Sequence, residues 1–328
     1  MPKNKARFYI GVDIGGTKIC AGLVTPSGEI LEREKIPAHE ESSPSRSLLA
    51  LIEIIQNLLA DRRLKNRDIR GIGIGIPGLV DAEKGKVLVT PNMNLSGINI
   101  IKELKAKFSV PILIGNDVNL GILGEEWLGA CRGSQNAIGL FLGTGLGGGI
   151  ISGGKLLIGH QGIAGELGHL IVDPRGPRCS CGNQGCLEAF IGRWAIERDI
   201  RNAINNGKKP KLQKLLKKKL FKIKSRVLKE ALAKKDPVVT PIIRGVCEHL
   251  GLACISLRHI FDPECIILGG GVIEACGDFI IPIVQKVLEK DKFFRRMRAC
   301  KVKKSLLGDD AILLGGVALA RQSEAKRA

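Results

Sequence analysis

The sequence lacks an uninterrupted apolar run of membrane-spanning length, and its N-terminus lacks the composition of a signal peptide. Both absences argue against an integral membrane protein and against secretion. Hydrophobic residues still make up 44% of the 328 residues, which is enough to bury a substantial core. We therefore expect a soluble, cytoplasmic protein, and the length favours two domains over one.

The sequence also lacks the usual signatures of nucleic-acid recognition, although its net charge is +19. Residues 207–235 contain thirteen Lys or Arg and one acid, Glu230, so one segment carries much of the surplus. Leucine and isoleucine recur there at spacings near three and four, which predicts an amphipathic helix with a basic, solvated face. No series of aromatic residues lies between the lysines for base stacking, so we expect neither a specific nucleic-acid partner nor a membrane partner. The charge can still attract anionic nucleotides or polyanions over a distance.

A disulfide framework is missing as well, because seven of the ten cysteines stand singly in apolar stretches. The other three, Cys179, Cys181 and Cys186, lie within eight residues and follow His169. This spacing is typical of ligands that converge on one tetrahedral ion, and it predicts a closed zinc site, with unligated thiols as the alternative. Four protein ligands leave no open position for water, so we expect a structural ion that stiffens a loop.

Two carboxylates, Glu166 and Glu188, flank the predicted zinc loop. Carboxylates held by a stiffened loop can accept hydrogen bonds from neighbouring hydroxyls of a polyol such as a sugar. The alternative is that both are ordinary surface charges.

Short apolar stretches and glycine turns predict two α/β halves that face a cleft. The first half is expected to hold strands at 8–14, 19–24 and 30–31, a helix at 44–64, a strand at 71–76, a helix at 98–108 and a strand at 111–115. The second is expected to hold a strand at 137–142, a glycine turn at 143–149, a return strand at 150–157, a helix at 241–261, a strand at 265–268, a glycine turn at 269–271 and a closing helix at 309–321. We expect an N-terminal α/β lobe over 1–117, completed by a C-terminal helix at 309–325, and a larger lobe over 118–308 with the zinc loop at 165–188.

The first glycine turn has the composition of a phosphate-binding loop. Asp13 ends the first predicted strand, and Gly-Gly-Thr-Lys follows at 15–18. Backbone amides of such a turn can surround phosphate oxygens while Asp13 holds a hydrated Mg²⁺. Residues 143–149 repeat the device. Neither segment is a Walker A loop or a dinucleotide fingerprint, because Gly-Lys-Ser/Thr is missing and a hairpin is expected to follow.

A candidate catalytic base follows the predicted strand at 111–115. Asn116 and Asp117 come directly after this strand and before a helix that begins near Val118. Transfer of a phosphoryl group to an alcohol needs a carboxylate within hydrogen-bond reach of the hydroxyl, and Asp117 is the candidate. The alternative role is an N-cap of the helix.

Taken together, these motifs resemble the ROK family of sugar kinases and repressors, in order and spacing and over nearly the whole chain. The segments that carry the resemblance are Asp13–Lys18, Gly73–Gly78, Pro91-Asn92, Asn116–Asn119, the Gly-Thr-Gly loop at 143–145, Gly165–His169 and Cys179–Glu188. The resemblance implies an actin/hexokinase-like ATPase fold with two α/β lobes, and ATP-dependent phosphorylation of the 6-hydroxyl of a hexose, most often glucose. It also implies a homodimer or higher homo-oligomer.

The resemblance further implies roles for single residues. Asn116 and Asp117 would hold the sugar's distal hydroxyls, and Asp117 would activate the 6-hydroxyl. Glu166, His169 and Glu188 would contact the sugar near C1 and C2. His169 would also be a zinc ligand, together with Cys179, Cys181 and Cys186. Gly78 and Asn92 would make further sugar contacts. ATP and Mg²⁺ would be bound by Asp13, Gly15, Gly16, Thr17, Lys18, Gly143, Thr144, Gly145, Gly147, Gly269, Gly270 and Gly271.

Several alternatives stay open. The substrate can be N-acetylmannosamine, N-acetylglucosamine or fructose, because discrimination at C2 depends on pocket shape. The donor can be polyphosphate, given the basic composition. A sugar-responsive repressor of the same family is the alternative from another functional class, but twelve residues before Asp13 leave no room for a DNA-binding domain of the expected kind.

Overall fold

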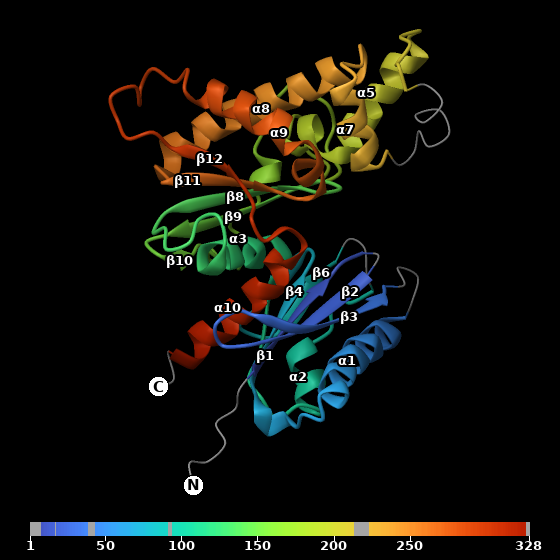
Figure 1. The fold of residues 1–328 in the computed structure, drawn as a ribbon, viewed down its shortest axis with the longest axis vertical. Helices are drawn as coiled ribbons and strands as arrows, with labels where there is room; N and C mark the ends of the chain where they lie inside the picture. The colour runs from blue at the N-terminus through green and yellow to red at the C-terminus, as the bar shows by residue number, and fades with distance from the viewer. Residues whose placement is uncertain (1–7, 17, 39–42, 91–93, 213–222, 326–328) are drawn as a thin grey trace. The chain divides into compact units, whose positions relative to one another are not determined.

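The computed structural model describes residues 8–16, 18–38, 43–90, 94–212 and 223–325 (Figure 1). The chain forms two compact units. Unit 1 consists of Met1–Gly133, Leu156–Ala164 and Asp309–Ala328, and unit 2 of Ser134–Lys155 and Gly165–Gly308. None of the helices in the described ranges is long and apolar enough to cross a membrane.

Unit 1 is built on a five-stranded sheet with the order β3-β2-β1-β4-β7. Strands β1 and β2 form an antiparallel hairpin that β3 extends, whereas β4 and β7 run parallel to β1. The strands are β1 (Phe8–Ile14), β2 (Lys18–Val24), β3 (Ile30–Pro37), β4 (Ile69–Ile76) and β7 (Ile112–Asn116), with a separate hairpin of β5 (Leu79–Asp81) and β6 (Lys86–Val89). The helices are α1 (Pro44–Asp61), α2 (Ile100–Lys105), α3 (Asp117–Leu128) and α10 (Ala311–Ala325), with a 3₁₀ turn, η1 (Asn66–Asp68).

The core of unit 1 lies between this sheet and the apolar stripe of α1. Leu51, Ile55 and Leu58 recur at helical spacing and are fully buried, as are Ile10 and Ile74 of the sheet. The side chain of Ser43 caps α1 by accepting a hydrogen bond from the amide of Arg46, which fixes where the helix begins.

Helix α10 packs with its backbone in contact with β4 and α3, because glycines lie where the helix crosses them. A side chain at Gly73 of β4 would overlap the carbonyl of Gly316, and one at Gly315 would overlap the carbonyl of Leu120 in α3. Small residues of this kind let a helix approach a sheet more closely than larger residues allow. The C-terminal helix is therefore an integral part of unit 1.

This packing also moves the boundary between the two parts of the chain. The division expected from the sequence ended the first lobe at residue 117, but α3 packs against α10 and β4 and belongs to unit 1, which runs to Gly133. The segment Leu156–Ala164 also joins unit 1.

Unit 2 repeats the same plan with a sheet of order β10-β9-β8-β11-β12. β8 and β9 are antiparallel, and β11 runs parallel to both β8 and β12. The strands are β8 (Ala137–Leu142), β9 (Leu146–Ser152), β10 (Lys155–Leu156), β11 (Cys265–Gly269) and β12 (Lys301–Lys304). The helices are α4 (Glu188–Ile191), α5 (Arg193–Asn205), α7 (Ser225–Ala233), α8 (Val239–Phe261) and α9 (Gly271–Leu288), with 3₁₀ turns η2 (Leu167–His169) and η3 (Gly308–Asp310).

The structure corrects the expected glycine turn at 143–149. Only residues 143–145 form the turn, and Gly147 to Gly149 lie in β9, paired with β8. A side chain at Gly148 would overlap the carbonyl of Gly165 and the side chain of Leu167. Gly148 therefore makes room for the turn η2.

The basic segment is also not one continuous helix over 207–235. Helix α7 covers only Ser225–Ala233, residues 208–210 have no regular structure, and 213–222 lie outside the described residues. Pro210 cannot donate a helical hydrogen bond, which explains the irregular start. Helix α9 and strand β12 were not expected from the sequence. In α9, Gly277 and Pro282 interrupt the helical period of the apolar residues.

Candidate functional site

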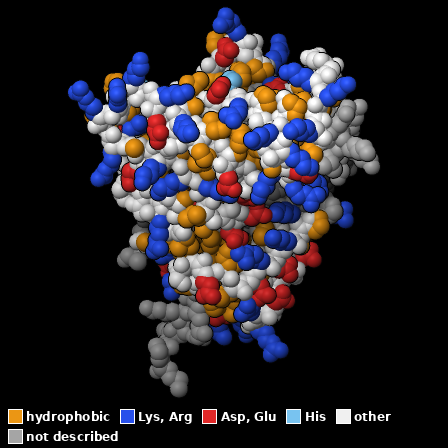
Figure 2. All heavy atoms as spheres, turned by 45° about the horizontal axis from the view of Figure 1, so that its top comes forward, with side chains coloured by type: hydrophobic (Ala, Val, Ile, Leu, Met, Phe, Trp, Pro, Cys, Tyr) orange, Lys and Arg blue, Asp and Glu red, His pale blue; other side chains and the backbone are white. Residues whose placement is uncertain are grey.

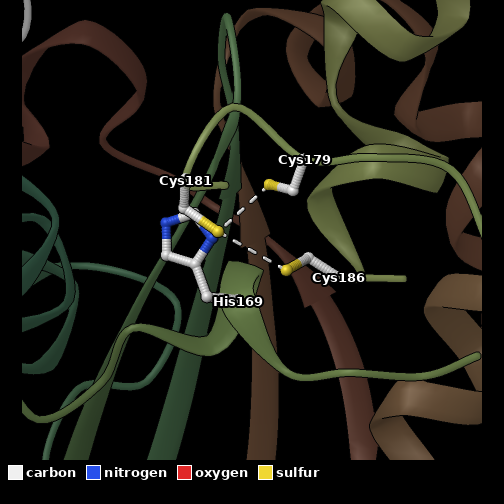
Figure 3. Close-up of side chains that lie close together, drawn as sticks. All are labelled: His169, Cys179, Cys181 and Cys186. Carbon is white, nitrogen blue, oxygen red and sulfur yellow. Dashed lines mark hydrogen bonds between the residues drawn. The ribbon is translucent and has the colours of Figure 1, made fainter. Parts of the chain in front are cut away.

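The imidazole of His169 and the thiols of Cys179, Cys181 and Cys186 point toward one another (Figure 3). One ligand atom from each lies within 4.8 Å of the others. The Sγ atoms of Cys181 and Cys186 are 3.6 Å apart, and Nδ1 of His169 is 3.7 Å from Sγ of Cys179. The four residues singled out from the sequence therefore meet at one point in unit 2.

A short hairpin holds the three thiols in place. The amide of Cys179 donates to the carbonyl of Asn183 at 2.8 Å, and the amide of Gly182 donates to the carbonyl of Cys179 at 3.1 Å. Arg178 pairs with Gln184, and Cys186 pairs with Ile171 just beyond η2. The last pairing brings the hairpin to the histidine.

The donor set fits a tetrahedral ion of the zinc type. With Zn–S bonds of about 2.3 Å, two thiolates stand about 3.8 Å apart, close to the Cys181–Cys186 separation. Burial raises the pKa of Cys186 to about 12 and raises that of Cys179, whereas the amide of Asn183 lowers the pKa of Cys181. Two of the three clustered thiols therefore resist ionisation. A bound cation is needed to hold them as thiolates.

Glu188 is buried, only 8% exposed, and its carboxylate joins three segments of unit 2. Oε2 accepts from the amide of Leu146 at 2.9 Å, and Oε1 accepts from the hydroxyl of Ser180 at 3.0 Å and the indole N–H of Trp194 at 3.4 Å. A side chain at Gly145 would overlap this carboxylate. Glu188 thus ties the zinc loop to the Gly-Thr-Gly loop, an arrangement that its sequence position did not reveal.

Glu166 and His169 lie on one side of η2. Nε2 of His169 is 4.0 Å from Oε2 of Glu166, and their side chains are 33% and 46% exposed. His169 therefore has one nitrogen near the thiols and the other near a solvent-accessible carboxylate. The three residues expected to contact the sugar near C1 and C2 share unit 2, but two are accessible and Glu188 is buried.

Asn116 and Asp117 lie where β7 meets α3 in unit 1. Oδ1 of Asn116 caps α3 by accepting from the amide of Asn119 at 3.0 Å, and its Nδ2 donates to the carbonyl of Gly78 at 3.0 Å. Asp117 is therefore the first residue of the helix and not its cap. Its carboxylate is half-buried, with Oδ1 accepting from the amide of Val118 at 2.9 Å. The predicted contacts Asn116 and Gly78 meet, whereas Asn92 lies outside the described residues.

The first glycine turn connects β1 to β2. The amide of Gly15 donates to the carbonyl of Lys18 at 2.9 Å and closes the turn, while Thr17 lies outside the described residues. Burial raises the pKa of Asp13 to about 6, against the opposing effect of Lys18. Nζ of Lys18 is 3.2 Å from Oδ2 of Asp309. Sequence reasoning missed Asp309, and the Asp-Asp pair that precedes the closing helix was the available signal.

The two glycine segments of unit 2 come together at the carboxyl ends of neighbouring strands. β8 ends at Leu142 and β11 at Gly269, and a side chain at Gly270 would overlap the backbone of Leu142. Gly270 has φ +84°, which a residue with a side chain adopts only with strain. The carboxyl ends of adjacent parallel strands are where ligands bind in such sheets.

Comparison with known proteins matches this architecture. Residues 9–323 match the model of the ROK family. The chain is 33% identical to a glucokinase of Thermotoga maritima, covering 98% of this chain and 99% of the relative, and 30% identical to a xylose repressor of Caldicellulosiruptor bescii, covering 94% and 77%. A ROK family glucokinase from Streptomyces griseus, solved in complex with glucose and AMPPNP, superimposes with a TM-score of 0.80 at 31% identity, covering 96% of this chain and 99% of that one.

These matches confirm the expected actin/hexokinase-like fold, with its two related α/β sheets. Because the family model covers almost the whole length and the relatives match end to end, the chain belongs to the ROK family.

Proposed function

We propose that this protein is an ATP-dependent hexose kinase that transfers the γ-phosphoryl group to the 6-hydroxyl of its sugar, with glucose as the preferred substrate. The observation that carries the proposal is the placement of Asp117. Asn116 takes the capping role at the start of α3, so the carboxylate of Asp117 is not needed as an N-cap. The relatives named glucokinase and the complex with glucose and AMPPNP support the same reaction class.

In the proposed reaction the 6-hydroxyl oxygen attacks the γ-phosphorus, and the bond from phosphorus to the bridging oxygen of ADP breaks. Asp117 accepts the hydroxyl proton, and the products are the sugar 6-phosphate and ADP. Asn116 and Gly78, which share a hydrogen bond of 3.0 Å, would position distal hydroxyls. Glu166 and His169 would accept and orient the hydroxyls near C1 and C2.

Two metal ions belong to the proposal. Zinc would be held by His169, Cys179, Cys181 and Cys186, and its contribution would be a rigid loop. Asp13 would hold the Mg²⁺ that accompanies ATP, since its half-buried carboxylate ends β1 beside the glycine turn. When bound, Mg²⁺ neutralises charge on the transferred phosphoryl group.

A sugar panel with ATP and Mg²⁺ tests the function. We expect glucose 6-phosphate from glucose, and a lower kcat/KM for N-acetylmannosamine, N-acetylglucosamine and fructose. Product analysis by NMR assigns the phosphorylated hydroxyl. Absence of ADP release with every hexose would overturn the proposal, whereas a higher kcat/KM for one of the other sugars would change only the substrate.

A sugar-responsive regulator is the second candidate, because one matched relative is a xylose repressor. Its signature would be salt-sensitive DNA binding that a sugar abolishes. A gel-shift titration with genomic fragments, with and without each sugar of the panel, separates this candidate from the kinase.

A further inference from the structure

Arg193 lies where three helices of unit 2 begin. It is the first residue of α5, and its Nη2 donates to the hydroxyl of Ser225, the first residue of α7, at 2.7 Å. The same Nη2 would be 3.1 Å from a Cβ built on Gly271, the first residue of α9. Ser225 Oγ would be 3.8 Å from that Cβ, so the guanidinium of Arg193 and the hydroxyl of Ser225 meet at the start of α9.

The guanidinium of Arg193 has no acidic partner in the described part of the chain. Its recorded hydrogen bond goes to the neutral hydroxyl of Ser225, and its Nε is buried without any hydrogen-bond partner. A buried guanidinium N–H without an acceptor is costly, because it loses water and gains nothing in return. Residues 213–222, which precede α7 and lie outside the described residues, contain no Asp or Glu.

The N-termini of α7 and α9 add positive charge beside this guanidinium. Each helix terminus carries amide N–H groups without intrahelical acceptors and about half a positive elementary charge. In α5, α7 and α9 no side chain caps these amides, in contrast to Ser43, Asn99 and Asn116 in unit 1. The first turns of α5 and α7 hold no acid, and that of α9 holds only Glu274.

A cation placed against the uncapped N-termini of α7 and α9 is electrostatically unfavourable unless an anion shares the site. The glycines at the start of α9 keep the space open, because Gly270 has φ +84° and Gly271 presents no side chain to Arg193. The Gly-Thr-Gly loop adjoins the site, since the amide of Trp194 donates to the carbonyl of Thr144 at 3.3 Å.

We infer that Arg193 and Ser225 bind a phosphate group of the nucleotide, one of those that ADP retains. The inference rests on the proposed kinase function and adds two residues that the family motifs did not indicate. Nε and the Nη groups of Arg193 present a planar fork of donors that suits two phosphate oxygens at once. The uncapped amides at the starts of α7 and α9 supply further donors, and Ser225 fixes the orientation of the guanidinium.

The test compares nucleotide binding by Arg193→Met and Arg193→Lys with binding by the full-length wild type. Isothermal titration calorimetry measures Kd for ADP, and displacement of ADP measures Kd for adenosine. Arg193→Met should weaken ADP binding about 10- to 100-fold, the usual effect of losing charge-assisted hydrogen bonds, and change adenosine binding by less than about twofold. Arg193→Lys should restore only part of the affinity, because an ammonium lacks the fork. Ser225→Ala should show a smaller loss of the same kind.

Arg226→Met is the matched control, since Arg226 adjoins Ser225, is exposed, and has the same charge. It should bind ADP as the wild type does. Equal ADP affinity in Arg193→Met and Arg226→Met would overturn the inference, as would an equal loss of ADP and adenosine affinity in Arg193→Met. If the wild type binds no ADP, both the inference and the kinase function are wrong. Wild-type ADP binding without phosphorylation of any hexose overturns the function alone.

Discussion

Asn116 and Asp117 are adjacent in sequence but have different roles in the structure. Asn116 satisfies the amide of Asn119 and the carbonyl of Gly78. The amide side chain of Asn116 is therefore the N-cap, and the carboxylate of Asp117, which accepts from the amide of Val118, is not. The distinction could not be made from the sequence, where either residue was a reasonable N-cap.

Substitution of Asp117 by Asn should lower kcat about 10²- to 10⁴-fold, because an amide cannot take the proton of the 6-hydroxyl. Sugar binding should persist within about tenfold, since the size and one acceptor oxygen are kept. Initial rates beside calorimetric glucose binding measure the two effects separately. Asp61→Asn, at the exposed end of α1, is the control for loss of one carboxylate in unit 1. Near-normal turnover by folded Asp117→Asn would mean that another residue is the catalytic base.

Asp13 shows the cost of a carboxylate held for a ligand. Burial raises its pKa from 3.8 to about 6, so the ligand-free folded state binds its proton more tightly than the unfolded state does. Well below pH 3.8 both states are protonated and the group has no effect on stability. As the pH rises through 4 to 6, the unfolded state loses its proton first, and stability falls until both states are ionised.

Asp13→Asn should therefore stabilise the protein without nucleotide or Mg²⁺ at pH 7, by ~3 kcal/mol at most. The gain should be much smaller at pH 4, where Asp13 is neutral in the folded state and only partly ionised in the unfolded state. Urea unfolding of both proteins at pH 4 and pH 7 measures the difference. Equal stability at pH 7 would mean that the folded protein does not oppose ionisation of this carboxylate. The same variant should be less active, because it loses the charge proposed to hold Mg²⁺.

Among the elements, the hairpin that carries Cys179, Cys181 and Cys186 is connected to the rest of unit 2 through Glu188. Oε1 contacts Ser180 in the hairpin, and Oε2 contacts Leu146 beside the Gly-Thr-Gly loop. A change in the hairpin therefore reaches both Glu166–His169 and the start of β9. Loss of the metal should weaken the proposed sugar contacts before the nucleotide contacts, since His169 is itself one of the four candidate metal ligands.

Elemental analysis should find about one zinc per chain, because four ligands close one ion. Cys181→Ala should lose most of it, and glucose affinity should fall before nucleotide affinity. Cys300→Ala, a buried cysteine outside the cluster, should keep its zinc and serves as the control. Undiminished zinc in Cys181→Ala would refute the ligand set.

Two buried carboxylates, those of Asp236 and Glu197, accept hydrogen bonds from backbone amides within the basic segment 207–235. Asp236 is fully buried and accepts from the amides of Lys211 at 2.7 Å and Val238 at 2.9 Å. Glu197 accepts from the amide of Ile223 at 2.7 Å. The segment between 212 and 223 is thus anchored at each end by hydrogen bonds that no charge pattern in the sequence indicated.

Asp236→Ala should destabilise unit 2 by about 2–5 kcal/mol, because it leaves several buried amides without an acceptor. It should also speed tryptic cleavage between 207 and 224. Asp278→Ala removes an exposed acid of α9 and should change neither property by more than a small amount. Unchanged cleavage in folded Asp236→Ala would show that the anchor is not needed to hold the segment.

For the whole molecule, the surplus positive charge comes from two segments of the chain. Besides 207–235, residues 290–304 hold eight Lys or Arg and one acid, Asp291. On the face shown in Figure 2, Lys and Arg side chains are spread across the surface among acidic and hydrophobic ones. A surplus of this size attracts anions by long-range electrostatics.

Exchange of Lys208, Lys209, Lys217 and Lys218 for Gln should therefore leave kcat at saturating ATP within about twofold. The apparent KM for ATP should rise slightly at low salt, where long-range attraction is least screened. A tenfold fall in kcat, about 1.4 kcal/mol of barrier, would instead place the segment in the catalytic machinery.

Much of the site was determined by the sequence itself. The spacing of Cys179, Cys181 and Cys186 predicts a metal-type cluster, because a short hairpin brings the three thiols together, and the pairing of Cys186 with Ile171 places His169 beside them. Strand and helix patterns placed most elements within a few residues, since alternation and helical period arise locally. The order of motifs also identified the family before any contact was known.

Only the tertiary structure decided the rest, because it depends on residues far apart in the chain. Burial of Glu188 against Leu146, the approach of Asp309 to Lys18, and the meeting of Arg193, Ser225 and Gly271 join segments that no local pattern relates. Gly147 to Gly149, expected in a turn, lie in strand β9, and Gly148 makes room for the turn η2, since a strand glycine and a loop glycine look alike in sequence. The chain encodes each donor and acceptor locally, but which of them remain without a partner is a property of the folded whole.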